Sequence, residues 1–104
     1  MRIIKGRYLF GFWEGQPYSF VTDKYKDFLS YKNTIDKQVV IAHIEKLNRW
    51  LASVQSYDMF TGEEFNSGFY EDGEFQFPVD FLRYYKTRDI GIPYEYEEYL
   101  KKIL

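Results

Sequence analysis

The number of aromatic side chains is the feature that most restricts how this chain can fold. Aromatic residues make up 22% of its 104 residues, with eleven tyrosines and ten phenylalanines, and cysteine is absent. One buried ring removes on the order of 150–250 Å² from water, so a few rings suffice for a small core. The chain has more rings than one such core can hold. Some rings are therefore expected at the surface, where tyrosine can keep its hydroxyl group in water.

The length indicates a single domain, residues 1–104, since domains usually need roughly 100–200 residues. The absence of cysteine excludes disulfide scaffolds and zinc sites of the cysteine type. The N-terminal segment MRIIKGRYLFGFWEG lacks the apolar core of a signal peptide, and no run of about 18 apolar residues occurs. We therefore expect a cytoplasmic protein that does not enter a membrane.

The N-terminal quarter has the pattern of a β-hairpin. Residues 2–13 are rich in β-branched and aromatic residues, which is typical of a strand. Residues 14–17, with the sequence EGQP, favour a turn, and residues 18–22 alternate again. These patterns predict an N-terminal hairpin whose two strands are residues 2–13 and 18–22.

A long amphipathic helix is predicted over residues 36–55. Asn33 and Thr34 can cap its start, and Asp36 places negative charge in its first turn. The apolar residues recur at helical spacing and share one face; they are Val40, Ile44, Leu47, Leu51 and Val54. This face is expected to pack on a sheet that contains the N-terminal hairpin.

The second half of the chain predicts another hairpin and two short helices. Asp72-Gly73 is a strong signal for a tight turn between residues 69–71 and 74–77. Pro78 and Pro93 each suit the first position of a helix. Taken together, the elements predict an α+β domain. It would comprise a twisted antiparallel sheet, one long helix on a face of that sheet and two short C-terminal helices.

No pattern in the sequence favours catalysis or a cofactor. His43 is the only histidine, and at the margin of the apolar stripe it is interpreted as a packed, hydrogen-bonded residue. The acids of residues 63–74 do not keep the alternating register of a calcium loop, because aromatic residues interrupt it. Neither a glycine-rich phosphate loop nor a nucleophile motif occurs. We expect a protein that is not an enzyme and needs neither cofactor nor metal.

The charge distribution favours a protein interface. Residues 57–82 contain seven acidic residues and no basic one, interleaved with aromatic residues. In the strands, phenylalanine can point to the core while the carboxylates point outward. Tyrosine and a charged rim are typical of protein-binding sites, and an acidic rim selects a basic partner. The predicted partner-binding residues are Glu63, Glu64, Tyr70, Glu71, Asp72, Glu74, Tyr94, Tyr96, Glu97 and Glu98.

A nucleic-acid-binding module is the alternative. Lys5 and Arg7 lie among Tyr8, Phe10 and Phe12, and exposed rings beside basic residues can stack on bases. The net charge of −2 argues against direct binding, because such modules usually carry a positive surface.

The chain also resembles a family of bacterial proteins. In its size, its lack of cysteine and the acidic aromatic stretches GEEFNSGFYEDGEF and DIGIPYEYEEYLKKIL, it is similar to immunity proteins of contact-dependent growth inhibition systems. The resemblance implies a small inhibitor that binds a cognate toxin, here expected to be a basic nuclease domain, and occludes its active site. Immunity proteins share no functional residues, so the resemblance implies no site residue.

Overall fold

The computed structural model describes residues 1–16 and 21–104, with the backbone alone described for residues 51–54. Five strands, one 3₁₀ helix (η1) and three α-helices make up the described chain. In chain order they are β1 (Arg2–Ile4), β2 (Arg7–Leu9), η1 (Tyr25–Ser30), α1 (Lys37–Glu45), β3 (Arg49–Tyr57), β4 (Glu64–Asp72), β5 (Phe75–Pro78), α2 (Val79–Thr87) and α3 (Tyr94–Ile103). No helix in these ranges is long and apolar enough to cross a bilayer.

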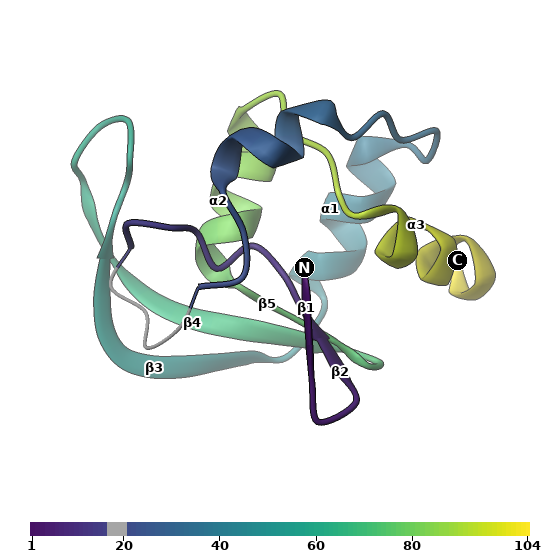
Figure 1. Cartoon of the computed structure of the whole chain (residues 1–104), viewed down its shortest axis with the longest axis horizontal. Helices are drawn as coiled ribbons and strands as arrows, with labels where there is room; N and C mark the ends of the chain where they lie inside the picture. Colours follow the sequence, from purple (N-terminus) through teal and green to yellow (C-terminus); the bar gives the residue numbers. More distant parts are fainter. Residues whose placement is uncertain (17–20) are drawn as a thin grey trace.

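The strands form one sheet in the order β1-β2-β5-β4-β3, with the helices stacked on one side of it (Figure 1). The predicted α+β class is confirmed. All neighbouring strands run antiparallel except β2 and β5, which run parallel. Backbone N–H groups of Tyr8 and Phe10 donate to the carbonyls of Glu74 and Gln76, at 2.8 and 3.1 Å. The sheet is therefore mixed, and the parallel pair attaches the N-terminal hairpin to the second hairpin.

The N-terminal hairpin exists, but it turns earlier than predicted. Strands β1 and β2 pair from Arg2 opposite Leu9 to Ile4 opposite Arg7, so Lys5 and Gly6 form the loop. Both loop residues have positive φ, 51° and 78°, as a type I′ turn requires. The predicted strand over residues 2–13 is thus two strands. The predicted second strand over residues 18–22 falls largely outside the described residues.

The predicted helix over residues 36–55 is wrong in its second half. Helix α1 begins after Asp36, whose carboxylate accepts hydrogen bonds from the backbone N–H groups of Gln38 and Val39, and it ends at Glu45. Residues 46–48 then reverse the chain into β3, which pairs with β4. Val40 and Ile44 are buried as predicted, whereas Leu47 is only half-buried. The side chains of the other two stripe residues, Leu51 and Val54, lie outside the described part.

The second hairpin and the two C-terminal helices are confirmed. Asp72 pairs with Phe75, so the loop is Gly73-Glu74, one residue later than the predicted Asp72-Gly73. Gly73 has a φ of 59°, which suits the first loop position of a type II′ turn. Helices α2 and α3 begin directly after Pro78 and Pro93.

The core is largely aromatic and centres on Phe10. The ring of Phe10 lies 4.8 Å from Phe77, 5.1 Å from Phe81 and 5.3 Å from Tyr96. These neighbours come from β5, α2 and α3, so one ring connects the sheet to two helices. Of the five phenylalanines between residues 60 and 77, Phe75 and Phe77 are buried, Phe65 and Phe69 are half-buried and Phe60 is exposed. The chain therefore has more aromatic rings than its core holds, as expected from the sequence.

Two substitutions in α1 test which of its faces supports the fold. Ile44 is fully buried, so Ile44→Ala should lower the free energy of unfolding by about 2–5 kcal/mol through lost contacts and a cavity. Val39, 47% exposed on the same helix, is the matched control, and Val39→Ala should change stability by no more than about 0.5 kcal/mol. Urea denaturation followed by tryptophan fluorescence measures both. Equal effects would contradict the assigned core.

Candidate functional site

Four of the ten predicted partner-binding residues lie inside the molecule. Tyr70, Asp72, Tyr96 and Glu97 are each at most 7% exposed. Tyr70 packs against Phe77 and the other three make internal hydrogen bonds. The prediction that these four side chains face a partner is therefore wrong. These residues lie on the sides of β4 and α3 that face the core. Their acidic and tyrosine character suggested a surface position that the fold does not give them.

Asp72 is the centre of a buried polar cluster at the end of β4. Its Oδ2 lies 2.8 Å from Nε2 of His43 and accepts a 2.7 Å hydrogen bond from the Tyr96 hydroxyl. The hydroxyl of Tyr99 donates to Oδ1 at 3.2 Å. Burial and the adjacent carboxylate raise the pKa of both tyrosines, which keeps them neutral donors. The cluster joins β4 to α1 and α3, and it matches the interpretation of His43 as a packed, hydrogen-bonded residue.

Glu97 fastens α3 to the segment that precedes α1. One carboxylate oxygen accepts from the backbone N–H groups of Thr34 and Ile35, at 2.7 and 3.0 Å, and the other accepts from the side chain of Asn33. Burial raises the pKa of Glu97, but these hydrogen bonds outweigh it and leave the pKa below its usual range. Lys101, one turn later, lies 3.7 Å from the same carboxylate. Glu97 is thus a structural residue.

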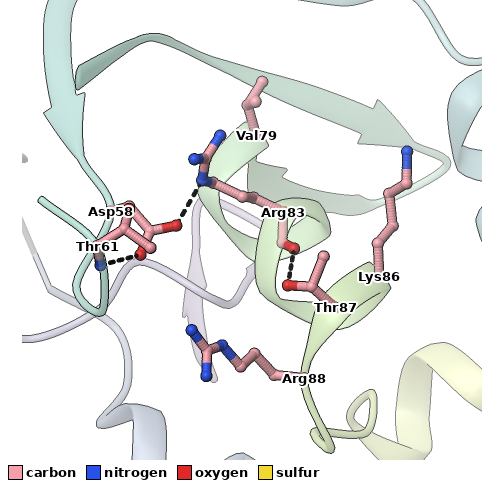
Figure 2. A pocket seen from close by; sticks show the side chains of 7 residues that line it. All are labelled: Asp58, Thr61, Val79, Arg83, Lys86, Thr87 and Arg88. Atoms are coloured by element: carbon pink, nitrogen blue, oxygen red, sulfur yellow. Dashed lines mark hydrogen bonds and ion pairs between the residues drawn. The ribbon is translucent and has the colours of Figure 1, made fainter. Parts of the chain in front are cut away.

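Arg83 on α2 binds two acids of the loop between β3 and β4. Its Nε donates to Asp58 at 2.7 Å and its Nη2 to Glu63 at 3.2 Å, and Figure 2 shows the first of these bonds. Asp58 also accepts from the backbone N–H groups of Phe60 and Thr61. Burial raises the pKa of Asp58, but the bond from Arg83 and these two backbone bonds outweigh it and lower the pKa to about 2.

Two other predicted acids also have partners on the sheet. Glu71 lies 3.7 Å from Arg7, on the strand beyond β5. Glu64 is opposite Tyr57 in the β3–β4 pair, and a hydrogen bond between their side chains raises the pKa of Tyr57. Residues at the two ends of β4 are about 26 Å apart at 3.3 Å per residue. Glu63 and Glu64 therefore cannot share one compact face with Glu74.

Three exposed glutamates lie on the β4–β5 loop and on α3, two segments that meet at Gly73 and Tyr99. Gly73 leaves room for the Tyr99 hydroxyl, which lies 2.7 Å from where a Cβ would stand. Glu74 follows in the same loop, while Glu98 precedes Tyr99 and Glu95 lies one turn before it. All three glutamates are exposed, and within the described ranges none has an ion-pair partner. We call Glu74, Glu95, Glu98 and Tyr99 the acidic end.

The acidic end contains two of the predicted residues and two that were missed. Glu74 and Glu98 were predicted, whereas Glu95 and Tyr99 were not included. The i, i+4 spacing of Glu95 and Tyr99 would have placed them together on the helix. Tyr94 is exposed beside this surface, with its hydroxyl accepting the backbone N–H of Lys32 at 3.0 Å.

The alternative nucleic-acid surface is not assembled on the N-terminal hairpin. Phe10 and Phe12 are buried, and half-buried Tyr8 stacks on Phe75 at 5.1 Å. Arg7 pairs with Glu71, and Lys5 stands exposed at the turn. The rings that were expected to stack on bases thus belong mainly to the core, and this placement does not favour the alternative.

Comparisons with known proteins give no assignment: no family model, no curated protein and no solved structure matches the chain. Among the described residues, no group of three or more histidine, cysteine, aspartate or glutamate side chains is placed to hold a metal ion.

The Asp72 cluster predicts that substitution of Asp72 lowers stability far more than substitution of the nearby Glu74. Asp72→Ala leaves the hydroxyls of Tyr96 and Tyr99 and the imidazole of His43 without their acceptor, so stability should fall by about 2 kcal/mol or more. Glu74→Ala, at an exposed loop position, should change stability by at most about 0.5 kcal/mol. Thermal and urea denaturation compare the two. Similar losses would show that the cluster does not stabilise the fold.

The ion pair of Asp58 predicts a particular response to acid. A depressed pKa stabilises the fold above the unfolded pKa of about 3.9, and this contribution disappears as pH falls toward 2. Carboxyl carbon NMR should therefore show Asp58 titrating near pH 2, and Arg83→Gln should move its midpoint toward 3.9. Glu63→Gln, which removes only the exposed partner of Arg83, should leave the Asp58 midpoint nearly unchanged. A wild-type midpoint near 3.9 would exclude the proposed ion pair.

Proposed function

We propose that this protein is a cytoplasmic inhibitor that binds a basic protein domain through the acidic end and blocks its active site. One observation supports the proposal above all. The fold gives Asp58, Glu63, Glu71 and Asp72 partners within the protein. Glu74, Glu95 and Glu98, on the β4–β5 loop and α3, stay exposed, and no cation among the described residues pairs with these three. Carboxylates that the fold does not use are available to a partner.

The chemistry of the acidic end suits a partner that normally grips phosphate. Enzymes that bind nucleic acids present lysine and arginine to the phosphate backbone. The three glutamates can pair with such cations, and a charged surface of this kind steers association with an oppositely charged partner. Half-buried Tyr99 and exposed Tyr94 add amphipathic rings, which are enriched at the centres of protein interfaces. A nuclease toxin domain is thus the partner class that we propose, in keeping with the resemblance to immunity proteins.

Charge reversal at the acidic end is the direct test. The test requires a basic domain encoded by a gene directly beside this one, co-expressed in a bacterial host and purified for binding kinetics. Wild-type protein should relieve the growth arrest that this domain causes, and salt should weaken the complex because it screens exposed charges. Glu74→Lys combined with Glu98→Lys should slow association by about tenfold or more.

The matched control is Glu14→Lys combined with Glu64→Lys, which makes the same change in net charge at exposed glutamates outside the acidic end. This variant should keep an association rate close to that of the wild type. The proposal is wrong if the neighbouring gene encodes no basic domain, if both double variants behave alike, or if salt does not affect binding.

A further inference from the structure

A groove runs along the outer face of α2. Residues 79, 83, 86 and 87 recur at helical spacing along this face, and the loop between β3 and β4 lies opposite. The groove has a volume of about 510 Å³, within the range of small-molecule sites, roughly 300–1,000 Å³. Its lining residues are Asp58, Thr61, Val79, Arg83, Lys86, Thr87 and Arg88 (Figure 2). We call it the α2 groove.

The side-chain oxygens of Asp58 and Thr61 in the lining already accept hydrogen bonds. Oδ1 of Asp58 accepts from the backbone N–H groups of Phe60 and Thr61, and Oδ2 accepts from Nε of Arg83. The hydroxyl oxygen of Thr61 accepts from the backbone N–H of Glu63 at 3.2 Å. A ligand in the groove therefore meets carboxylate and hydroxyl oxygens that have partners.

Several donors in the lining have no partner. The guanidinium of Arg88 makes neither a hydrogen bond nor an ion pair with any residue in the described ranges, and Nη1 of Arg83 is equally unengaged there. The Thr61 hydroxyl keeps its hydrogen available because its oxygen acts only as an acceptor. The hydroxyl of Thr87 donates to the carbonyl of Arg83 at 2.9 Å and keeps its acceptor capacity, but the charged groups with free hydrogen-bonding capacity are cations. The complementary ligand therefore carries anionic oxygens.

Both guanidinium groups are held by rings before any ligand arrives. The guanidinium carbon of Arg88 lies 3.8 Å from the centroid of the Phe60 ring, and that of Arg83 lies 4.5 Å from the Phe65 ring. Phe60 is itself fixed by edge contacts with Tyr25 and Tyr84. A stacked guanidinium keeps its N–H edges free for an anion. This preorganisation reduces the entropy lost on binding.

The competing carboxylates outside the lining are easily displaced. Glu63, which pairs with Arg83, is 68% exposed, and Glu45, which pairs with Lys86, is 49% exposed. Exposed ion pairs are worth only about 0–1 kcal/mol. In Figure 2 the Lys86 side chain extends away from Arg88, and the guanidinium groups of Arg83 and Arg88 lie on opposite sides of Asp58 and Thr61. Arg88 is therefore the principal donor, and Lys86 lies at the rim.

We propose that the α2 groove binds a small molecule that carries a phosphate monoester. Arg88 would contact the phosphate oxygens, and Thr61 would donate a further hydrogen bond. Arg83, on the other side of Thr61, would add positive charge, and Val79 would contact the organic part. A phosphate monoester, with three terminal oxygens and a charge of up to about −2, matches the Arg88 guanidinium, a hydroxyl donor and a second cation in the lining better than a carboxylate with two oxygens and one charge. This site goes beyond the proposed inhibition and uses none of the residues of the acidic end.

NMR titration of the uniformly ¹⁵N-labelled protein tests the site. The ligands are inorganic phosphate, phenyl phosphate and adenosine monophosphate, with benzoate and adenosine as controls that lack the phosphate. The amide signals of residues 58–62 and 83–88 should shift saturably with both organic phosphates and not with benzoate or adenosine. Tighter binding of the organic phosphates than of inorganic phosphate would show that the apolar part of the groove contributes.

Arg88→Gln should raise the dissociation constant for phenyl phosphate by about tenfold or more, since a hydrogen-bonded charge is lost. Lys5→Gln, which removes the same charge at the exposed β1–β2 turn, should change the constant by less than about twofold because the site is distant and screened. Arg88→Lys keeps the charge but loses the planar fork, so it should bind with intermediate strength. Thermal denaturation of each variant separates loss of binding from loss of fold.

Three results would overturn the site. They are equal shifts with benzoate and phenyl phosphate, equal losses in Arg88→Gln and Lys5→Gln, and tighter binding of a single-stranded oligonucleotide than of adenosine monophosphate. The last result would identify nucleic acid as the ligand. Each outcome leaves the test of the acidic end unaffected, because that test varies only residues outside the α2 groove.

Discussion

The buried carboxylate of Asp72 is the contact on which the arrangement of this fold depends. A charge removed from water is costly unless hydrogen bonds replace its hydration. Asp72 receives three such contacts, from His43 on α1 and from Tyr96 and Tyr99 on α3. Because the donors come from two helices and the acceptor ends a strand, satisfying one charge also fixes how both helices lie on the sheet. Gly73 permits this approach, since a side chain there would occupy the position of the Tyr99 hydroxyl.

The same requirement explains why an acid-rich sequence does not produce one acidic surface. Between residues 57 and 82 the chain has no basic residue of its own, so its acids find donors in other elements. Arg83, Arg7 and His43 come from α2, β2 and α1. The pairings with His43 and Arg83 leave Asp72 and Asp58 buried and out of reach of a partner. Within this stretch, Glu74 is an exposed acid for which the described residues offer no ion-pair partner.

The sequence predicted the elements that rest on local chemistry and missed those that rest on distant pairing. Glycine and proline signals located the second hairpin and the starts of α2 and α3, because turn geometry is decided by adjacent residues. The prediction of a helix over residues 36–55 failed because Leu47, Leu51 and Val54 continue the helical spacing past the point where the chain reverses. What makes residues 49–57 a strand is pairing with β4, which no local pattern reveals. Similarly, the bond from His43 to Asp72 spans 29 positions, so Asp72 was taken for a surface acid.

The two ends of β4 offer opposite charges to a ligand, although both belong to one acidic stretch of the sequence. At the start of the strand, Asp58 and Glu63 are bound by Arg83, and the neighbouring groove offers donors. At its other end, Glu74 follows Gly73, which contacts Tyr99 on the acid-rich helix α3. A rigid strand of about 26 Å separates the two, well beyond the Debye length of about 8 Å at physiological salt. Ligands at the two ends therefore do not influence each other through charge, and any coupling between them would have to pass through the shared core.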